Sequence, residues 1–237
     1  MKTYDLYLES GPKHKTTMVH VLQLSGCMAN GKTTADAVAA TPEAIRTYLR
    51  FLKRHGEAVD PDASFETRVA EHITQGQFLG SGSAQAIYAP DFEPLNPREI
   101  ELLLARSRWL RDALADWAAS QTDKQLDAEP HGGGRPARKV LLHAMPISYL
   151  SPVLGPVKGV SSLASAAEKG RVPLADAIRE IGARSADRVR EATPEQRGAV
   201  VQKPDAPRTL RRAVRRMLEH DWEHLAELSR RPDGPKP

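Results

Sequence analysis

Residues 212–228 read Arg-Ala-Val-Arg-Arg-Met-Leu-Glu-His-Asp-Trp-Glu-His-Leu-Ala-Glu-Leu. At about 100° of rotation per helical residue, the apolar side chains of this stretch gather along one face. His224 and Asp221 lie close to the centre of that face, and His220 lies at its edge. Four residues separate the two histidines, so on a helix they lie one turn apart on the same side. The stretch therefore predicts a core-facing helix over about residues 207–230 that carries two imidazoles inward.

Inward-facing polar side chains need partners, because an unpaired buried polar group costs about 1–3 kcal/mol. A metal ion is one such partner, and two neutral imidazoles one turn apart can bind it together. In the alternative interpretation, both histidines are partly exposed or form local hydrogen bonds. Asp221 is equally open, since it could orient a histidine or pair with an arginine of another helix. The choice between a metal site and local bonding depends on whether a third ligand exists.

A third inward-facing histidine is predicted in a helix at about residues 136–154. Residues 137–150 read Ala-Arg-Lys-Val-Leu-Leu-His-Ala-Met-Pro-Ile-Ser-Tyr-Leu, and His143 falls within the apolar face of this helix. Pro146 removes a backbone donor and is expected to kink the helix near the histidine. If the two helices run antiparallel, the three imidazoles could meet at one depth. Three neutral histidines with the remaining positions open to water are typical of catalytic metal sites.

Composition limits the class of protein. The chain has 237 residues, of which 40% are hydrophobic and 27% charged, as expected for two globular domains. It has no apolar run of the ~18 residues that a membrane span needs, and its N-terminus does not resemble a signal peptide. The single cysteine, Cys27, cannot form an internal disulfide. These features predict a cytoplasmic protein with no membrane association.

Charge is distributed unevenly along the chain. Residues 1–95 hold 9 Lys and Arg against 11 Asp and Glu, whereas the remainder holds 25 against 19. Much of this basic excess is expected on the outer, solvated face of the last helix, where Glu219 and Glu223 would pair with neighbouring arginines. A basic face can follow a phosphate backbone, but few aromatic residues interleave here and the glutamates interrupt it. A nucleic-acid partner is therefore not expected. The arginines of this face are Arg208, Arg211, Arg212, Arg215 and Arg216.

Hydrophobic patterning predicts two domains with a boundary near residue 90. Alternation indicates strands at 3–9, 17–24 and 64–73, and a helix at about 34–54 is interrupted by Pro42. The stretch 76–97 is rich in Gly, Ser and Pro, although Ala86-Ile-Tyr88 could add a short strand. Beyond it only helices are expected, at about 98–120, 136–154, 173–192 and 207–230. The predicted fold is a small α+β domain (1–90) followed by an all-α four-helix bundle (91–237).

The C-terminal pattern resembles the DinB-like four-helix bundle superfamily over about residues 97–230. The resemblance rests on His143 in the second helix and on Leu-Glu-His-Asp-Trp-Glu-His-Leu at 218–225. It implies a divalent metal ion, with Zn or Ni the first choices, bound by His143, His220 and His224. It also implies activation of a low-molecular-weight thiol by that metal, in a thiol S-transferase or a thiol-dependent isomerase. Such bundles often form homodimers, so a dimer is expected as well.

Residues 26–33, Gly-Cys-Met-Ala-Asn-Gly-Lys-Thr, match a phosphate-binding loop pattern. The preceding strand is not continuously apolar and the domain is short for a nucleotide hydrolase, which argues against that interpretation. The same residues, with Glu-Ala-Ile-Arg-Thr-Tyr-Leu at 43–49, resemble the HicB-like antitoxin fold over about residues 3–75. In that family the glycines shape a turn and the threonine caps a helix. The DNA-binding segment usual in such antitoxins is absent from this pattern, and the bundle follows instead.

Two classes of function remain open from the sequence. One is a metal-dependent enzyme that acts on a low-molecular-weight thiol. The other is a non-enzymatic binding or regulatory protein, in which the HicB-like domain recognises a partner or small ligand and the metal is structural or vestigial. Metal content and thiol turnover would distinguish the two.

Overall fold

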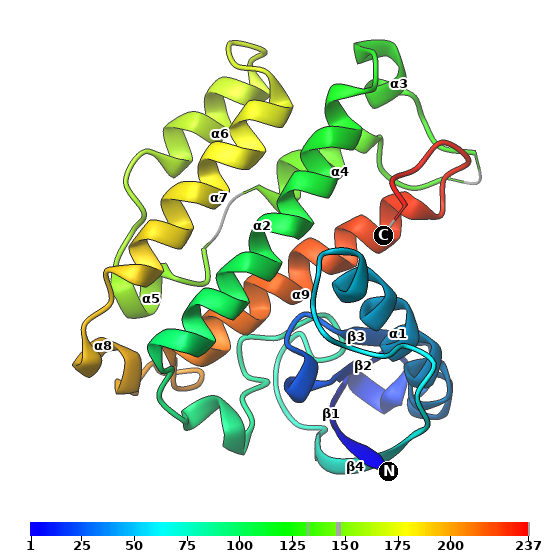
Figure 1. The fold of residues 1–237 in the computed structure, drawn as a ribbon, viewed down its shortest axis with the longest axis vertical. Helices are drawn as coiled ribbons and strands as arrows, with labels where there is room; N and C mark the ends of the chain where they lie inside the picture. The colour runs from blue at the N-terminus through cyan, green and yellow to red at the C-terminus, as the bar shows by residue number, and fades with distance from the viewer. Residues whose placement is uncertain (132, 146–147, 237) are drawn as a thin grey trace. The chain divides into compact units, whose positions relative to one another are not determined.

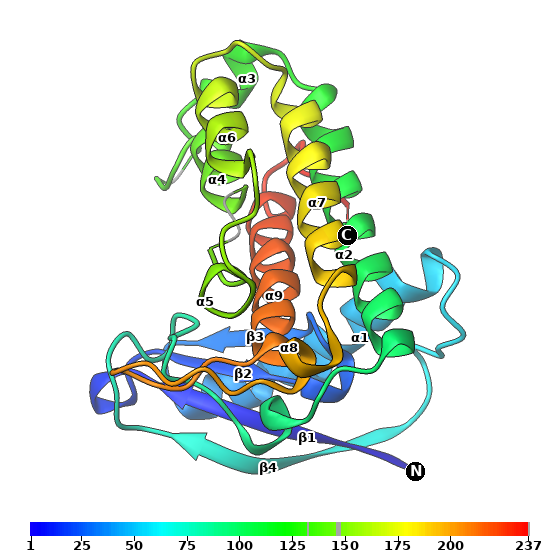
Figure 2. The ribbon, with the colours of Figure 1, turned by 90° about the vertical axis from the view of Figure 1, so that its left-hand side faces the viewer.

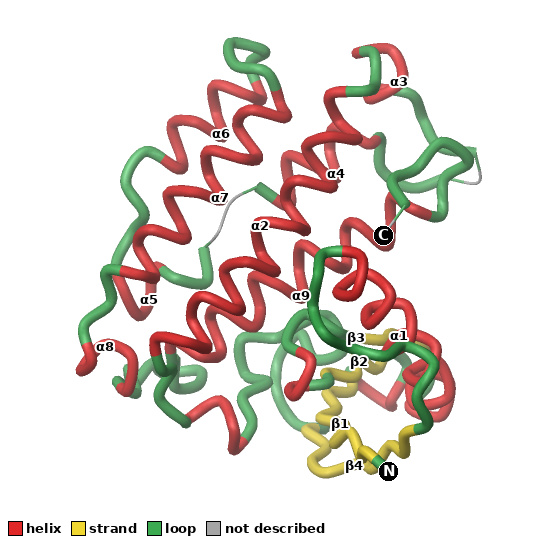
Figure 3. Tube along the Cα trace, in the orientation of Figure 1, coloured by secondary structure: helices red, strands yellow, loops and turns green. Residues whose placement is uncertain are grey.

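The computed structural model describes residues 1–131, 133–145 and 148–236. Figures 1 and 2 show the chain coloured from the N- to the C-terminus, and Figure 3 distinguishes its helices, strands and loops. The order of elements confirms the predicted fold class: a part with a four-stranded sheet and a helix is followed by a part built of helices.

The chain divides into two compact units. The first comprises Met1–Pro94 and Gly198–Glu219, and the second comprises Leu95–Arg197 and His220–Pro237. The last helix, α9 (Leu210–Ser229), therefore contributes its first half to one unit and its second half to the other. The predicted boundary near residue 90 places all of α9 with the helices, whereas its first half packs with the sheet.

The first unit is built on a sheet with the strand order β3-β2-β1-β4. β1 pairs antiparallel with β2 and parallel with β4, and β2 pairs antiparallel with β3. The strands predicted at 3–9 and 64–73 are confirmed. The strand predicted at 17–24 is shorter, because the chain turns at Leu22–Leu24 into a strand that alternation did not indicate. The strands are β1 (Lys2–Ser10), β2 (Thr17–His20), β3 (Met28–Gly31) and β4 (Phe65–Ile73).

Helix α1 (Thr34–Arg54) packs against β2 and β3. Thr33 caps its N-terminus by accepting a hydrogen bond from the backbone of Asp36. Pro42 could have marked a kink or a fresh helix start; the fresh start is wrong, because one continuous helix runs through this residue. A 3-10 turn (Pro12–His14) joins β1 to β2. No strand forms at residues 86–88, where a short one was considered, and a second 3-10 turn (Ala89–Phe92) follows them.

Other atoms of the protein occupy the space beside the two glycines of the phosphate-loop pattern. A Cβ at Gly26, whose φ is +105°, would lie 2.2 Å from the hydroxyl of Tyr48. A Cβ at Gly31 would lie 2.3 Å from the backbone nitrogen of Ala37. These glycines allow α1 to approach the turn closely, so their lack of a side chain is required by the packing of the protein. The structural role that the HicB-like resemblance assigns to them is consistent with this packing.

The predicted solvated arginine face on α9 is wrong for the first half of the helix. Arg212, Arg215 and Arg216 are at most 3% exposed. Arg215 forms two hydrogen bonds with the carboxylate of Asp91, at 2.9 and 2.7 Å, and Arg212 donates to the backbone oxygen of Ala86 at 3.1 Å. A helix face rich in arginine is thus buried because acidic and carbonyl oxygens of the first unit pair with it.

Glu219 and His20 complete this buried network. Glu219 accepts hydrogen bonds from Arg215 at 3.0 Å and from Arg216 at 2.9 Å, which confirms its predicted pairing with these arginines. His20 of β2 lies between two carboxylates, with Nδ1 2.9 Å from Glu219 and Nε2 3.2 Å from Glu9. Burial alone would lower the pKa of His20, but the charges and hydrogen bonds of these carboxylates raise it.

The second unit is helical. Its first long helix begins as predicted, because Asn96 and Glu99 form a reciprocal capping box. The predicted helix over 136–154 is wrong in length: it ends at Ala144, and a separate short helix follows at Ser151–Leu154. The expected kink at Pro146 lies outside the described residues. The helices are α2 (Pro97–Ala119), α3 (Asp123–Asp127), α4 (Ala137–Ala144), α5 (Ser151–Leu154), α6 (Val160–Glu168), α7 (Leu174–Arg190) and α8 (Pro194–Gly198).

The sequence predicted four helices of about equal length, but the second unit contains more helices, and their lengths differ. α2 and α7 pack along each other, α6 packs on α7, and α4 contacts α6. Neither α3 nor α6 was predicted, because both are short and follow loops rich in glycine or polar residues. Among the described helices, none combines the length and apolar character that crossing a membrane would require.

Candidate metal centre

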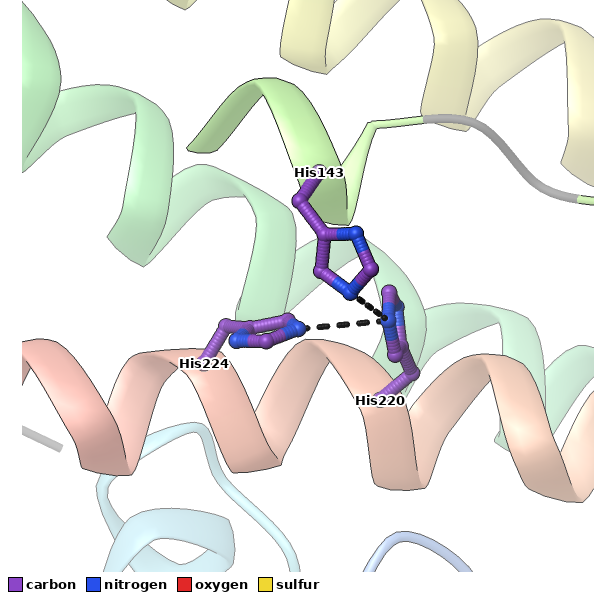
Figure 4. A group of neighbouring side chains, drawn as sticks. All are labelled: His143, His220 and His224. Carbon is purple, nitrogen blue, oxygen red and sulfur yellow. Dashed lines mark hydrogen bonds between the residues drawn. The ribbon is translucent and has the colours of Figure 1, made fainter. Parts of the chain in front are cut away.

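His143, His220 and His224 come together in the second unit (Figure 4). His143 lies one residue before the end of α4, at the edge of the buried face that includes Val140 and Leu141; it is exposed, although the sequence predicted an inward position. His220 and His224 lie one turn apart on α9. The structure therefore brings together the three histidines that the sequence singled out. Whether they bind a metal is a separate question, which their geometry addresses.

The ligand atoms converge on one point. Nε2 of His220 lies 3.4 Å from Nε2 of His143 and 3.2 Å from Nε2 of His224. The ligand atoms of the three residues all lie within 4.8 Å of one another. Zinc-to-imidazole bonds of ~2.0–2.1 Å in tetrahedral geometry separate two ligand nitrogens by about 3.4 Å. The two closest separations therefore suit nitrogens that share a metal ion.

Glu227 fixes the orientation of His224. Its carboxylate lies 3.0 Å from Nδ1 of His224, so a neutral His224 carries its proton on Nδ1 and directs the lone pair of Nε2 toward the other histidines. Arg135 donates to the same carboxylate at 3.0 Å. Burial alone would raise the pKa of Glu227, but His224 and Arg135 lower it, so this carboxyl remains ionised.

Neutral imidazoles are favoured in this environment. Burial lowers the pKa of His143, with a further contribution from the positive charge of Arg135. Burial also lowers the pKa of His224 and outweighs the opposite effect of Glu227. Both groups are therefore neutral at pH 7, which is the form that coordinates a metal.

Hydrogen bonds among the histidines do not satisfy all three Nε2 atoms well. His224 presents a lone pair at Nε2, so the bond to His220 requires the proton on His220. The Nε2–H of His220 would then have to donate to both His224 and His143 in a bifurcated bond. A proton on Nε2 of His143 as well would point at the proton of His220. A cation at the same point would be coordinated by all three lone pairs. The donor set therefore fits a divalent ion such as Zn²⁺ or Ni²⁺.

The described residues add no carboxylate ligand to this group. Three neutral imidazoles would not reduce the positive charge of a bound ion. This is typical of sites where the metal activates a bound water or substrate. His143 is exposed and His224 is buried, so the site can be reached from the side of His143. The ring of Tyr149 lies 5.8 Å from that of His220, between ring centres.

Glu227 and Arg135 were not predicted as parts of the site. The spacing of His224 and Glu227, three residues apart on one helix, could have indicated the first. Arg135 precedes α4, and nothing in its local sequence points to Glu227. The open question about Asp221 is resolved: it pairs with Arg111 of α2 through two hydrogen bonds of 3.0 and 3.1 Å and does not orient a histidine.

Comparison with known proteins agrees with this geometry. The model of the DinB superfamily matches residues 106–228, about half of the chain, and this match includes all three histidines. The chain belongs to the DinB superfamily. This superfamily is generally metal-binding, and the three-histidine cluster of this DinB protein is where a metal is expected.

The N-terminal part of this DinB protein has a different relative. It is similar to UPF0150 protein Ta0767 of Thermoplasma acidophilum, with 40% identity over 52 residues, which is 22% of this chain and 75% of that protein. This match supports a HicB-like domain fused to the DinB-like part. No solved structure gives a significant match to the chain.

Proposed function

We propose that this protein uses a divalent metal at His143, His220 and His224 to activate a low-molecular-weight thiol, as a thiol S-transferase or a thiol-dependent isomerase. The observation that supports this proposal most is the convergence of three Nε2 atoms, two of their separations being 3.2 and 3.4 Å. Zinc and nickel are the proposed metals because both accept imidazole nitrogen. When bound, the metal would act as a Lewis acid and lower the pKa of a coordinating thiol.

The residues of the chain have distinct roles in this proposal. His220 and His224 are held one turn apart by α9, and His143 is brought to them by the packed side of α4. Glu227 holds the proton of His224 on Nδ1, which keeps Nε2 available, and Arg135 keeps Glu227 ionised and in place. All three ligands of the site are imidazoles and carry no negative charge. A metal-bound thiolate would therefore not be repelled by an anionic ligand.

The proposal is tested with the metal-loaded protein and a panel of thiols, including glutathione, cysteine and coenzyme A. Each thiol is paired with monochlorobimane, an electrophile that becomes fluorescent when its chloride is displaced by sulfur. We expect metal-dependent turnover with at least one thiol, and its loss in His143→Ala. Lys139→Ala is the matched control, because Lys139 is exposed on the same helix and should retain activity.

The same assay separates the enzyme from a binding protein. Metal-loaded protein that turns over none of the thiols, with this electrophile or with isomerisable substrates, would contradict the enzymatic proposal. It would favour the alternative, in which the HicB-like domain recognises a partner and the metal is structural.

A further inference from the structure

The first unit holds a second group of titratable and hydroxyl side chains, which the proposed function does not use. The hydroxyl of Ser10 lies 2.7 Å from that of Thr17 and 3.3 Å from that of Thr34. Nε2 of His72 lies 2.7 Å from the Ser10 hydroxyl, and Nδ1 of His14 lies 3.4 Å from the Thr34 hydroxyl. The two imidazoles thus approach one cluster of hydroxyls, with their ring centres 5.5 Å apart.

Tertiary structure assembles this group. Ser10 ends β1 and pairs in register with Thr17, which begins β2. Thr34 is the first residue of α1, and His72 lies on β4 beside Leu8 of β1. His14 lies in the connection between β1 and β2. Five side chains from separate segments of the first unit therefore meet at one place, which local sequence patterns do not require.

The surrounding loops are held in unusual conformations. Lys13 and His14 have φ values of 56° and 52°, in the left-handed region that residues other than glycine rarely adopt. A Cβ at Gly80, whose φ is +82°, would lie 2.5 Å from the backbone oxygen of Thr16. The loop that follows β4 therefore packs directly on the β1–β2 connection. Such packing keeps His14 in a conformation that an isolated loop would not favour.

The charge around the hydroxyls is suited to an anion. Lys13, Lys15 and Lys32 are exposed in the adjoining loops and form no ion pair within the described part of the chain. Burial and the proximity of His14 both lower the pKa of His72, so this imidazole takes up a proton in acidic solution or when an anion lies beside it. No carboxylate takes part in the hydrogen bonds of the group that the structure describes. A metal cation would find two imidazoles here but no anionic ligand.

We propose that His14, His72 and Thr34 bind a phosphate group, either inorganic phosphate or the terminal phosphate of a nucleotide. Thr34 is partly exposed and both histidines are exposed, so these three side chains can contact phosphate oxygens. Ser10 and Thr17 are buried, and their hydroxyls position His72 and Thr34. Protonated imidazoles donate charge-assisted hydrogen bonds, which are stronger than those between neutral groups. Binding should therefore be tighter at pH 6 than at pH 8.

The test is a titration of the full-length, ¹⁵N-labelled protein with inorganic phosphate at constant ionic strength, followed through the histidine imidazole signals. We expect saturable shifts of the His14 and His72 signals and an upward shift of the pKa of His72. His72→Gln should weaken binding about tenfold, the effect of losing one charge-assisted hydrogen bond. Lys53→Ala, an exposed substitution in the last turn of α1, should leave the affinity unchanged.

Adenosine monophosphate, titrated in parallel, distinguishes the two sources of the phosphate. Tighter binding of the nucleotide at the same histidines indicates a phosphorylated ligand, and equal or weaker binding indicates free phosphate. The proposal is overturned if His14 and His72 show no saturable shift, or if His72→Gln binds phosphate as well as the unmodified protein does. Shifts confined to His143, His220 and His224 also overturn it, because they place the anion at the other site. None of these outcomes affects the proposed thiol activity.

Discussion

The two halves of α9 both bury polar side chains, but they satisfy them in different ways. In the first half, residues 210–219, Arg215 and Glu219 bond to each other and to side chains of the same unit. In the second half, residues 220–229, Asp221 is paired with Arg111, whereas His220 and His224 direct Nε2 atoms at each other and at His143.

The difference shows how a structural network can be told from a ligand site. The buried arginines of the first half bond to carboxylates or to backbone carbonyl oxygens, so the network requires no added group. The two histidines of the second half and His143 of α4 direct three Nε2 atoms at one point, with the carboxylate of Glu227 on the opposite edge of His224. Buried polar side chains alone therefore do not indicate a ligand site. Such a site is indicated where several lone pairs point at one place and the side chains have too few N–H groups to pair with them.

The largest effect should come from breaking the network of the first half. Glu219→Gln removes the negative charge that Arg215, Arg216 and His20 share, and leaves buried positive charges uncompensated. We expect the free energy of unfolding to fall by about 3–5 kcal/mol, measured by urea denaturation of the metal-free protein. A loss below about 1 kcal/mol would mean that the network contributes little to stability.

A smaller effect should come from the carboxylate behind the metal centre. Glu227→Gln can no longer hold the Nδ1 proton of His224 with a charged partner, so metal affinity should fall about 10- to 100-fold. Competition with a metal-sensitive dye measures this change. Glu129→Gln, an exposed residue before α4, is the control and should keep the original affinity. Equal affinity in both variants would show that Glu227 does not support the site.

The pH dependence of metal affinity should reflect the neutral histidines. The pKa values of His143 and His224 lie below the ordinary value of 6.5, so both are already deprotonated at pH 7. Affinity should change little between pH 7 and 8. It should fall about tenfold between pH 7 and 5.5, as protons compete for the same nitrogens. An increase in affinity on acidification would contradict this account.

The smallest effect is expected for an exposed ion pair on α1. Glu43 and Arg50 are 2.5 Å apart but remain 70% and 45% exposed. Glu43→Gln should change the free energy of unfolding by less than about 1 kcal/mol in the same urea experiment. A loss comparable to that of Glu219→Gln would mean that burial is not what distinguishes the two pairs.

Patterns within single helices predicted part of this structure. The apolar face of the last helix placed His220 and His224 inward, and the periodicity around His143 supplied the third histidine. Arg215 and Arg216 were predicted to face solvent, because the periodicity of a single helix does not show which other elements pack against it. Two partners of Arg215, Asp91 and His20, lie more than a hundred residues away in sequence, and helical periodicity carries no information about them.

Other differences have equally local causes. β3 is short and follows a turn at Gly26, so it gives too little alternation to be detected. The helix around His143 ends at Ala144, although its apolar pattern continues to Leu154. Prolines at positions 146 and 152 interrupt the sequence there, and proline cannot donate a hydrogen bond in the interior of a helix. This error in helix length did not affect the prediction of the site, because His143 precedes both prolines.

Elemental analysis tests the central claim most directly. The protein is purified without chelators and without a polyhistidine tag, and its metal content is measured beside those of His143→Ala, His224→Ala and Lys139→Ala. The account predicts about one zinc or nickel ion per chain in the unmodified protein and in Lys139→Ala, and loss of the metal in both histidine variants. Histidine variants that keep their metal, or an unmodified protein that binds neither ion on reconstitution, would contradict it.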